Sequence, residues 1–279
     1  MQDSFGRNID YLRAALTDRC NLKCWYCVGR ADKAHWPAEQ LLTHEEFVRV
    51  LRVAVERLGI IKIRLTGGEP LLYDRLEEMI KTLRALPQLQ ELTLTTNGLL
   101  LPDKAPMLRR AGLHRVNVSL EGATEQVYRQ ITGKACLQQV LNGLDALLKA
   151  GFEKPKINMV LCRSFSRDEL LQLLDIGQRY AREFRFIELM GHAEHRSPTA
   201  DDILRYCSFN HARRKRHRHP PLCHRRLRCN PGDDTVALRT ILRRLSPHSV
   251  GRRRTIAHLF VQPHRRASAR KTTRPLHRR

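Results

Sequence analysis

The sequence predicts an α/β protein built as an open, partial (β/α)6 TIM-like barrel, followed by an irregular basic C-terminal tail. Six short apolar segments alternate with helical patterns up to residue 190, the order of a parallel sheet with right-handed crossovers. Polar residues occupy every second position in most of these segments, and beyond residue 190 no sustained periodicity remains. We therefore expect a core domain of residues 1–190 and an Arg- and His-rich, poorly ordered region of residues 191–279.

The alternation within the strands favours a barrel over a flat sheet. In the second strand, Lys62 and Arg64 alternate with Ile63 and Leu65. A sheet covered by helices on both faces is apolar on both, and a closed eight-stranded barrel fills its lumen with Val, Ile and Leu. An open barrel with a polar lumen accounts for the pattern. The predicted strands are residues 10–16, 60–66, 92–96, 115–120, 156–161 and 184–190.

Two other interpretations of the pattern remain. The sheet could be doubly wound, or the polar residues could lie on edge strands rather than in a lumen. No G-x-G-x-x-G follows the first strand, which disfavours a doubly wound dinucleotide-binding sheet.

Helices are predicted between the strands. Thr43 with Glu46 three residues later is a capping box, and Gly59 ends the helix that it begins. Apolar residues from Phe47 to Leu58 recur on one face of this helix. The other predicted helices cover residues 75–86, 104–111, 137–150 and 168–180.

The charge of the chain is unevenly distributed. The net charge is +23 over 279 residues, and residues 191–279 hold 23 Lys and Arg against 5 Asp and Glu. No apolar run approaches the roughly 18 residues of a membrane span, and the N-terminus has no signal-peptide pattern. We therefore expect a cytoplasmic protein without a membrane partner.

Three thiols, Cys20, Cys24 and Cys27, form a C-x3-C-x2-C cluster. Soft thiolates at such spacing bind zinc or an iron–sulfur cluster, but structural zinc takes four closed ligands and no fourth Cys or His lies nearby. Three thiolates that leave one iron open suit a [4Fe–4S] cluster with a further ligand. A chance cluster and a redox dithiol are the alternatives. The other cysteines are expected to be isolated thiols: Cys136, Cys162, Cys207, Cys223 and Cys229.

A second motif, Thr66-Gly67-Gly68-Glu69-Pro70, follows the second strand. Glycines let the backbone approach a ligand closely, and the Glu69 carboxylate can accept a hydrogen bond from a ligand amine. Alone, the motif is equally typical of a turn.

Together the two motifs resemble those of the radical S-adenosylmethionine (SAM) enzymes, and longer segments resemble the GTP 3′,8-cyclase (MoaA) family of molybdenum-cofactor biosynthesis. The resemblance covers about residues 5–190. It is carried by residues 5–7, 11–13, 16–24, 63–70, 95–98, 131–133, 156–160 and 185–190. It implies a radical SAM-type barrel and a lyase in which a 5′-deoxyadenosyl radical abstracts H3′ of GTP before C3′ attacks C8.

The resemblance also implies roles for individual residues, and none acts as a catalytic residue beyond the cluster and SAM. The implied cluster ligands are Cys20, Cys24 and Cys27. The implied SAM contacts are Tyr26, Gly68, Ser119 and Met190. The implied GTP contacts are Arg13, Arg64, Thr95 and Lys156, of which Lys156 fits least because it begins its strand. An electron donor is required, and a homodimer is left open.

The sequence departs from the family in three places. Val28-Gly29 replaces Met-Pro, and Glu121 replaces Asp. The family's C-terminal second cluster needs C-x2-C, whereas Cys207, Cys223 and Cys229 lie 16 and 6 residues apart. The chain is therefore expected to hold one cluster and to be inactive toward GTP as written.

The tail has three readings. An out-of-frame 3′ end is favoured over a basic arm for nucleic acid, because aromatic residues that stack on bases are nearly absent. The third reading is a metal site of His217, His219, Cys223, His224 and Cys229. The alternative functions are a single-cluster radical SAM enzyme with another substrate, an iron–sulfur electron carrier and a basic nucleic-acid-binding protein.

Overall fold

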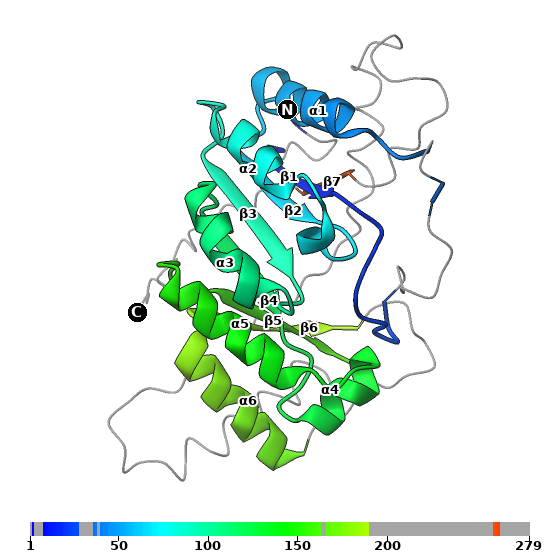
Figure 1. The fold of residues 1–279 in the computed structure, drawn as a ribbon, viewed down its shortest axis with the longest axis vertical. Helices are drawn as coiled ribbons and strands as arrows, with labels where there is room; N and C mark the ends of the chain where they lie inside the picture. The colour runs from blue at the N-terminus through cyan, green and yellow to red at the C-terminus, as the bar shows by residue number, and fades with distance from the viewer. Residues whose placement is uncertain are drawn as a thin grey trace, which may run out of the picture.

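The computed structural model describes residues 8–27, 40–162, 166–189 and 259–262, together with residues 2, 36 and 37. One sheet of seven strands has the order β6-β5-β4-β3-β2-β1-β7 (Figure 1). Strands β1 to β6 pair in parallel, and β7 pairs with β1 in the antiparallel sense. The strands are β1 (Tyr11–Ala15), β2 (Lys62–Thr66), β3 (Glu91–Thr96), β4 (Arg115–Ser119), β5 (Lys156–Leu161), β6 (Glu183–Glu188) and β7 (Leu259–Gln262).

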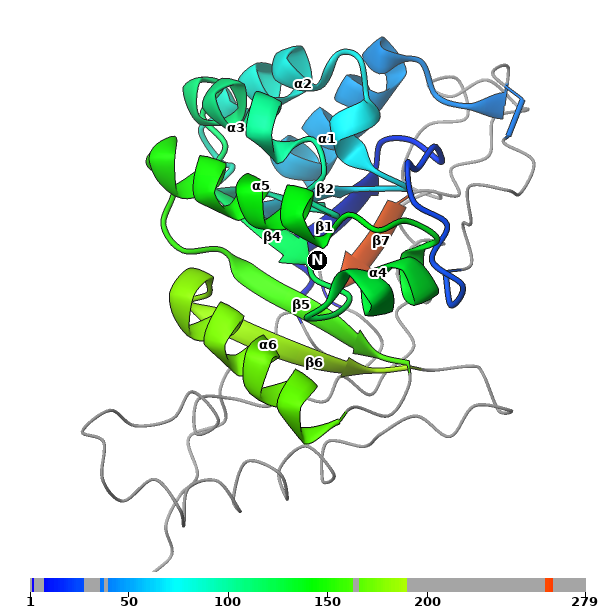
Figure 2. The same cartoon turned by 60° about the horizontal axis from the view of Figure 1, so that its bottom comes forward.

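Helices connect the parallel strands. Figure 2 shows α2, α3, α5 and α6 following one another along one side of the curving sheet. The arrangement confirms the predicted open, partial barrel with helices outside. The helices are α1 (His44–Leu58), the 3-10 turn η2 (Pro70–Leu72), α2 (Leu76–Arg84), α3 (Leu101–Arg110), α4 (Glu125–Thr132), α5 (Leu137–Lys149) and α6 (Arg167–Tyr180).

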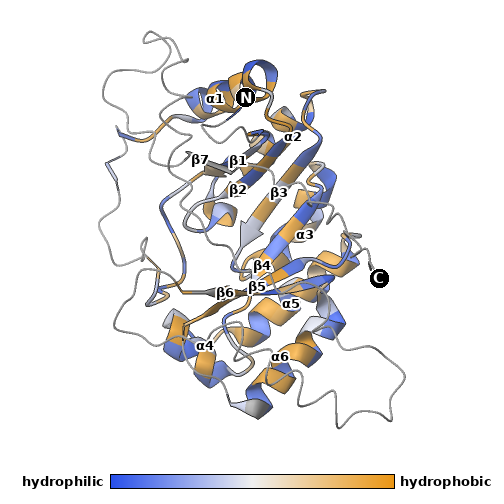
Figure 3. Cartoon of the chain, turned by 180° about the vertical axis from the view of Figure 1, so that it is seen from behind, coloured by the Kyte–Doolittle hydropathy of each residue, from blue (hydrophilic) through white to orange (hydrophobic). Residues whose placement is uncertain are grey.

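The core lies between the helices and the apolar face of the sheet. Ile63 and Leu65 of β2 are completely buried, while Lys62 and Arg64, which alternate with them, are half-buried on the opposite face. In Figure 3, which is coloured by hydropathy, β2 carries both hydrophilic and hydrophobic colours. The predicted polar lumen is therefore present. Side chains from the helices complete the core, among them Leu51, Met79, Ile80, Leu108 and Leu144.

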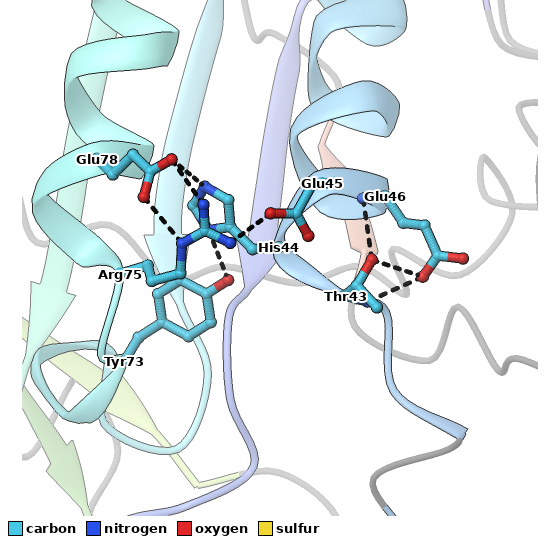
Figure 4. Close-up of polar contacts among 7 residues, drawn as sticks. All are labelled: Thr43, His44, Glu45, Glu46, Tyr73, Arg75 and Glu78. Carbon is cyan, nitrogen blue, oxygen red and sulfur yellow. Dashed lines mark hydrogen bonds and ion pairs between the residues drawn. The ribbon is translucent and has the colours of Figure 1, made fainter.

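Local signals set the ends of α1 as predicted. The Thr43 hydroxyl accepts the N–H of Glu46 at 3.3 Å, and the Glu46 carboxylate accepts the N–H of Thr43 at 2.9 Å (Figure 4). Gly59 ends the helix with φ of 74°, a left-handed conformation that costs glycine little. The capping box and the glycine thus explain why this helix begins and ends where it does.

The structure adds elements that the sequence did not predict. Helix α4 has a cap at Thr124 and a left-handed Gly133, but it is only 8 residues long. Helix α3 begins at Leu101 rather than at residue 104, because Pro102 lies in its first turn, where a missing N–H costs nothing. Strand β7 lies in the tail that was expected to be irregular. The predicted division at residue 190 stays a prediction.

A polar cluster joins α1 to the start of α2 (Figure 4). His44 is 8% exposed, and its Nδ1 lies 3.0 Å from the Tyr73 hydroxyl. Its Nε2 lies 3.6 Å from a carboxylate oxygen of Glu78. Arg75 also binds Glu78, at 2.7 Å, and forms an ion pair with Glu45.

Within the described residues, no helix is long and apolar enough to cross a membrane.

We expect His44→Ala to lower the free energy of unfolding by about 1–2 kcal/mol, because the half-buried Tyr73 loses the partner of its hydroxyl and a small cavity forms at the buried His44. Urea unfolding followed by circular dichroism measures this change. The control is Glu56→Ala on the exposed side of the same helix, which should change stability by less than about 0.5 kcal/mol. Equal stabilities for the two variants would contradict the assigned role of His44.

Candidate functional site

The cysteine loop follows β1 and is anchored at both ends. The Leu16 N–H donates to the Thr66 carbonyl at 2.8 Å, which extends the pairing of β1 with β2. Farther along, the N–H of Lys23 donates to the Thr132 carbonyl at 2.9 Å, and the N–H of Trp25 donates to the end of α4 at 3.0 Å. The loop is therefore held across the carboxyl ends of the parallel strands, where barrel active sites lie.

The three clustered cysteines are free thiols on this loop. Cys20 and Cys24 are half-buried and Cys27 is exposed. Burial raises the pKa of the Cys20 and Cys24 thiols, so each needs a positively charged partner to become a thiolate. In the part of the chain that the structure describes, no three His, Cys, Asp or Glu side chains are grouped closely enough to hold a metal ion.

The two glycines of the G-G-E-P segment pack directly against the cysteine loop. The N–H of Gly68 donates to the Thr17 carbonyl at 2.7 Å, and the N–H of Glu69 donates to the Arg19 carbonyl at 2.7 Å. A Cβ atom on Gly68 would lie 2.2 Å from the Arg19 carbonyl oxygen, and one on Gly67 would lie 2.4 Å from that of Thr17. The close approach permitted by these glycines is thus to the chain's own cysteine loop.

The Glu69 carboxylate accepts hydrogen bonds inside the protein, and its contact with a ligand amine stays a prediction. Its side chain is 1% exposed, and one oxygen accepts the Thr96 hydroxyl at 2.7 Å and the Leu71 N–H at 3.0 Å. The other oxygen accepts the Asn97 N–H at 2.8 Å. Burial raises the pKa of Glu69 to about 7 despite these bonds. The carboxyl group therefore joins the carboxyl ends of β2 and β3.

Of the residues predicted to contact SAM, Tyr26, Gly68 and Ser119 lie in or beside this region. Tyr26 hydrogen-bonds the buried Glu121, which follows β4, and burial raises the pKa of the Glu121 carboxyl to about 7. Ser119 ends β4 and is half-buried. Met190 lies outside the described residues, as do Val28 and the cysteines of the tail.

Strand register places the predicted GTP contacts in two adjacent rows of the lumen. Arg13 pairs with Arg64 between β1 and β2. Thr95 pairs with Asn117, and Asn117 pairs with Lys156. Lys156 begins β5, yet it lies level with Thr95 near the carboxyl end of β3. Its place at the start of a strand is therefore no objection to a role in the lumen.

The lumen carries a concentration of positive charge. The Nε atoms of Arg13 and Arg64 are buried and have no hydrogen-bond partner among the described residues. The Arg64 guanidinium lies 5.2 Å from the centre of the Tyr11 ring. Burial, followed by the nearby charges of Arg13 and Arg185, lowers the pKa of Arg64. Among the described residues, these observations define a cationic surface in the lumen.

Arg185 on β6 belongs to this surface, although no role was predicted for it from the sequence. Its Nε donates to Glu183 at 2.8 Å, and the Lys156 ammonium lies 2.9 Å from the other oxygen of the same carboxylate. Burial alone would raise the pKa of Glu183, but the bonds from Arg185 and Lys156 outweigh it and hold the pKa at about 2. Glu183 therefore fixes two cations that face the lumen. Alternation within β6 was the only signal that pointed to Arg185.

The model of the Radical SAM superfamily matches residues 15–176, more than half of the chain. The chain belongs to the radical SAM superfamily. Solved structures agree on the fold. SuiB of Streptococcus suis bound to S-adenosylmethionine has a TM-score of 0.61 at 18% identity, over 74% of this chain and 48% of that one. The maturase HydG of Carboxydothermus hydrogenoformans has a TM-score of 0.56, also at 18% identity, over 70% of this chain and 49% of its own.

Curated relatives are more similar in sequence. A GTP 3′,8-cyclase of Clostridium perfringens (strain SM101 / Type A) is 41% identical over 190 residues, which are 68% of this chain and 58% of the relative. That of Moorella thermoacetica is 44% identical over 193 residues, again 68% and 58%. Molybdenum cofactor biosynthesis protein 1 of Drosophila melanogaster is 40% identical over 190 residues, 68% of this chain and 33% of the relative. The chain thus spans less than two thirds of these relatives.

Membership of this superfamily assigns a [4Fe–4S] cluster and SAM to the chain as cofactors. The residues present fit such a cluster by their donor chemistry, because three free thiols lie on one anchored loop and soft thiolates suit iron–sulfur centres. The Cys20 sulfur already accepts the Leu22 N–H at 3.5 Å, an interaction common around cluster sulfurs.

Proposed function

We propose that this radical SAM chain is a lyase of the GTP 3′,8-cyclase type. Enzymes of this type convert GTP to (8S)-3′,8-cyclo-7,8-dihydroguanosine 5′-triphosphate in molybdenum-cofactor biosynthesis, whereas this chain as written is proposed to cleave SAM without completing the cyclisation. The observation that carries the proposal is 40–44% identity to named cyclases across the region that forms the barrel. The cationic lumen gives independent support, since a triphosphate is an anionic partner for half-buried arginines whose Nε atoms have no hydrogen-bond partner among the described residues.

In this proposal Cys20, Cys24 and Cys27 hold the cluster, which supplies one-electron chemistry toward SAM when bound. The chain's part is to anchor the cysteine loop and to limit its motion. The hydrogen bonds of Gly68 and Glu69 to the loop backbone, at 2.7 Å each, do this on one side. Contacts with the end of α4 do it on the other.

SAM would lie at the carboxyl ends of the strands, against Tyr26, Gly68, Ser119 and Met190. The Gly68 N–H is occupied by the Thr17 carbonyl, so its own carbonyl oxygen is the atom that it offers to the SAM ammonium group. Tyr26 is held by its hydrogen bond to Glu121, which fixes the ring at the border of the loop. Ser119 shares its row with Asn158 and Arg185 by register.

GTP would lie deeper in the lumen, against Arg13, Arg64, Thr95 and Lys156. Arginines bind phosphate oxygens in pairs of hydrogen bonds, whereas the ammonium of Lys156 acts as a point charge. Arg185 joins these residues, because Glu183 holds it beside Lys156. Glu183 thereby becomes a positioning residue for the substrate phosphates.

The proposal includes an external electron donor and a reducing cytoplasmic location, since thiolates stay reduced in such a compartment. The alternative of a single-cluster enzyme with another substrate is favoured by one observation: no C-x2-C exists among the tail cysteines. A nucleic-acid role of the tail is not favoured, and of the tail only β7, Leu259–Gln262, belongs to the described residues.

The test is anaerobic reconstitution followed by incubation with dithionite, SAM and GTP and chromatography of both products. We expect about four irons per chain and slow release of 5′-deoxyadenosine, without cyclised nucleotide. The reason is that the tail cysteines lack the C-x2-C spacing that the resemblance requires for a second cluster beside the substrate, and a misplacement of about 1 Å costs roughly 100-fold in rate. A matched Cys24→Ala variant should release no deoxyadenosine.

Two outcomes of this test would contradict parts of the proposal. Cyclised nucleotide at a rate comparable with deoxyadenosine release would show that this chain completes the GTP site. No iron in the wild-type chain, with thiols free and the protein folded, would contradict the cluster assignment itself.

A further inference from the structure

The Asn97 side chain connects the end of β3 to the first cysteine of the loop. Its Nδ2 donates to the Asn21 side-chain oxygen at 2.7 Å and lies 3.9 Å from the Cys20 sulfur. An amide nitrogen carries two hydrogens, and here each has an acceptor. Asn97 is thus a side chain from outside the loop that donates to a sulfur predicted to bind the cluster.

The orientation of this amide is fixed by its other contacts. The Asn97 side-chain oxygen accepts the Leu99 N–H at 3.1 Å, so a rotation that exchanges oxygen and nitrogen would bring two donors together. The Asn97 backbone N–H donates to Glu69 at 2.8 Å, and Glu69 is itself buried and bonded through both carboxylate oxygens. The donor therefore points at Cys20 because a rigid set of neighbours holds it there.

The sulfurs of the three cysteines differ in these contacts. Cys20 accepts two N–H groups, from Leu22 at 3.5 Å and from Asn97. Hydrogen bonds to cluster sulfurs withdraw negative charge, which favours the reduced cluster and raises its potential. Cys27, at the opposite end of the motif, is exposed to solvent. The protein thus applies a fixed dipole to one side of the predicted cluster.

We propose that Asn97 is a positioning residue that raises the reduction potential of the cluster by donating a hydrogen bond to the Cys20 sulfur. The inference rests on the proposed function, because it assumes that Cys20 binds the cluster. It adds a residue that acts through Cys20 and touches neither SAM nor GTP. Asn97 would also set how readily the external donor reduces the cluster.

The main variant is Asn97→Leu, which keeps the shape of the side chain, excludes water and removes both donors. Asn97→Asp keeps the oxygen that accepts from Leu99 and replaces the donor by a negative charge. The matched control is Asn21→Ala. This change removes the 2.7 Å bond that steadies the amide but leaves the hydrogen directed at sulfur.

Each protein is reconstituted anaerobically without SAM, its iron is counted, and the cluster is titrated potentiometrically with electron paramagnetic resonance as readout. We expect about four irons in every variant. At a fixed potential, the ratio of reduced to oxidised cluster should fall roughly tenfold in Asn97→Leu, which corresponds to about 59 mV for one electron. The ratio should fall further in Asn97→Asp and by less than threefold in Asn21→Ala.

The outcomes separate this inference from the proposed function. A wild-type chain without a cluster overturns both. A wild-type cluster with an unchanged potential in Asn97→Leu overturns the role of Asn97 alone. Equal shifts in Asn97→Leu and Asn21→Ala also overturn it, because they would reflect a loosened loop rather than a lost donor. Failure of both Asn97 variants to hold iron would assign Asn97 to assembly and likewise overturn the inference.

Discussion

Gly68→Ala should leave the barrel folded and remove most of the iron from the reconstituted protein. The new Cβ would lie 2.2 Å from the Arg19 carbonyl oxygen and 2.6 Å from its carbon, distances that no Cβ tolerates. Both clashing atoms belong to backbone, so a side-chain rotation cannot relieve them. The cysteine loop must move away, and Cys20 follows Arg19 directly. We expect less than about one tenth of the wild-type iron after exposure to a chelator, because an incomplete ligand set holds metal poorly.

The control for this variant is Gly59→Ala at the end of α1. Gly59 has φ of 74°, and a Cβ there meets nothing within 4 Å. The substitution therefore costs only the roughly 1–2 kcal/mol of left-handed strain and leaves the loop alone. Iron content and far-ultraviolet circular dichroism are measured for both variants. Wild-type iron in Gly68→Ala would mean that the loop and the glycine segment are not packed together as described.

Much of the barrel was predictable because its signals are local. The alternation of Lys62 and Arg64 with Ile63 and Leu65 gave both the strand and the polar lumen, and the structure shows that face pattern. Thr43 and Gly59 gave the ends of α1 for the same reason. Strand β7 was not predictable in this way, because it depends on pairing with β1, more than two hundred residues away in sequence. Helix α4 was missed because an 8-residue element carries too few turns for a periodic pattern.

In the candidate site, too, local features were predictable from the sequence and contacts between distant segments were not. Spacing alone placed Cys20, Cys24 and Cys27 on one loop. It did not reveal which groups Glu69 contacts inside the protein, since its partners at Thr96 and Asn97 come from the end of another strand. Arg185 was given no role because its link to Lys156 runs through Glu183 and the register of β5 with β6.

The cations of the lumen lead to the second large expectation, which concerns stability. Arg64 lies near Arg13 and Arg185, and burial together with these charges lowers its pKa. The folded protein without an anion therefore carries a repulsion that the unfolded chain lacks. A polyphosphate that binds the folded state should relieve it and raise stability, by about 2.7 kcal/mol at 100 times the dissociation constant.

Arg64→Met keeps most of the side-chain volume and removes the charge. We expect the ligand-free variant to be more stable than the wild type by about 1 kcal/mol, because relief of repulsion and of buried charge exceeds the roughly 0.5–1 kcal/mol lost with the Tyr11 ring contact. The gain from inorganic tripolyphosphate or GTP should fall by more than half. Anaerobic urea unfolding at fixed ionic strength, with and without each anion, measures both effects.

Arg52→Met on the exposed face of α1 is the matched control, and it should change neither quantity by more than about 0.5 kcal/mol. Stabilisation by GTP but not by tripolyphosphate would indicate that the protein recognises the nucleoside rather than the phosphates. A less stable Arg64→Met that keeps the full anion response would contradict the role given to the lumen cations. The opposite signs expected for stability and binding follow from one cause, since the clustered charge that weakens the barrel without an anion is the charge that a polyphosphate requires.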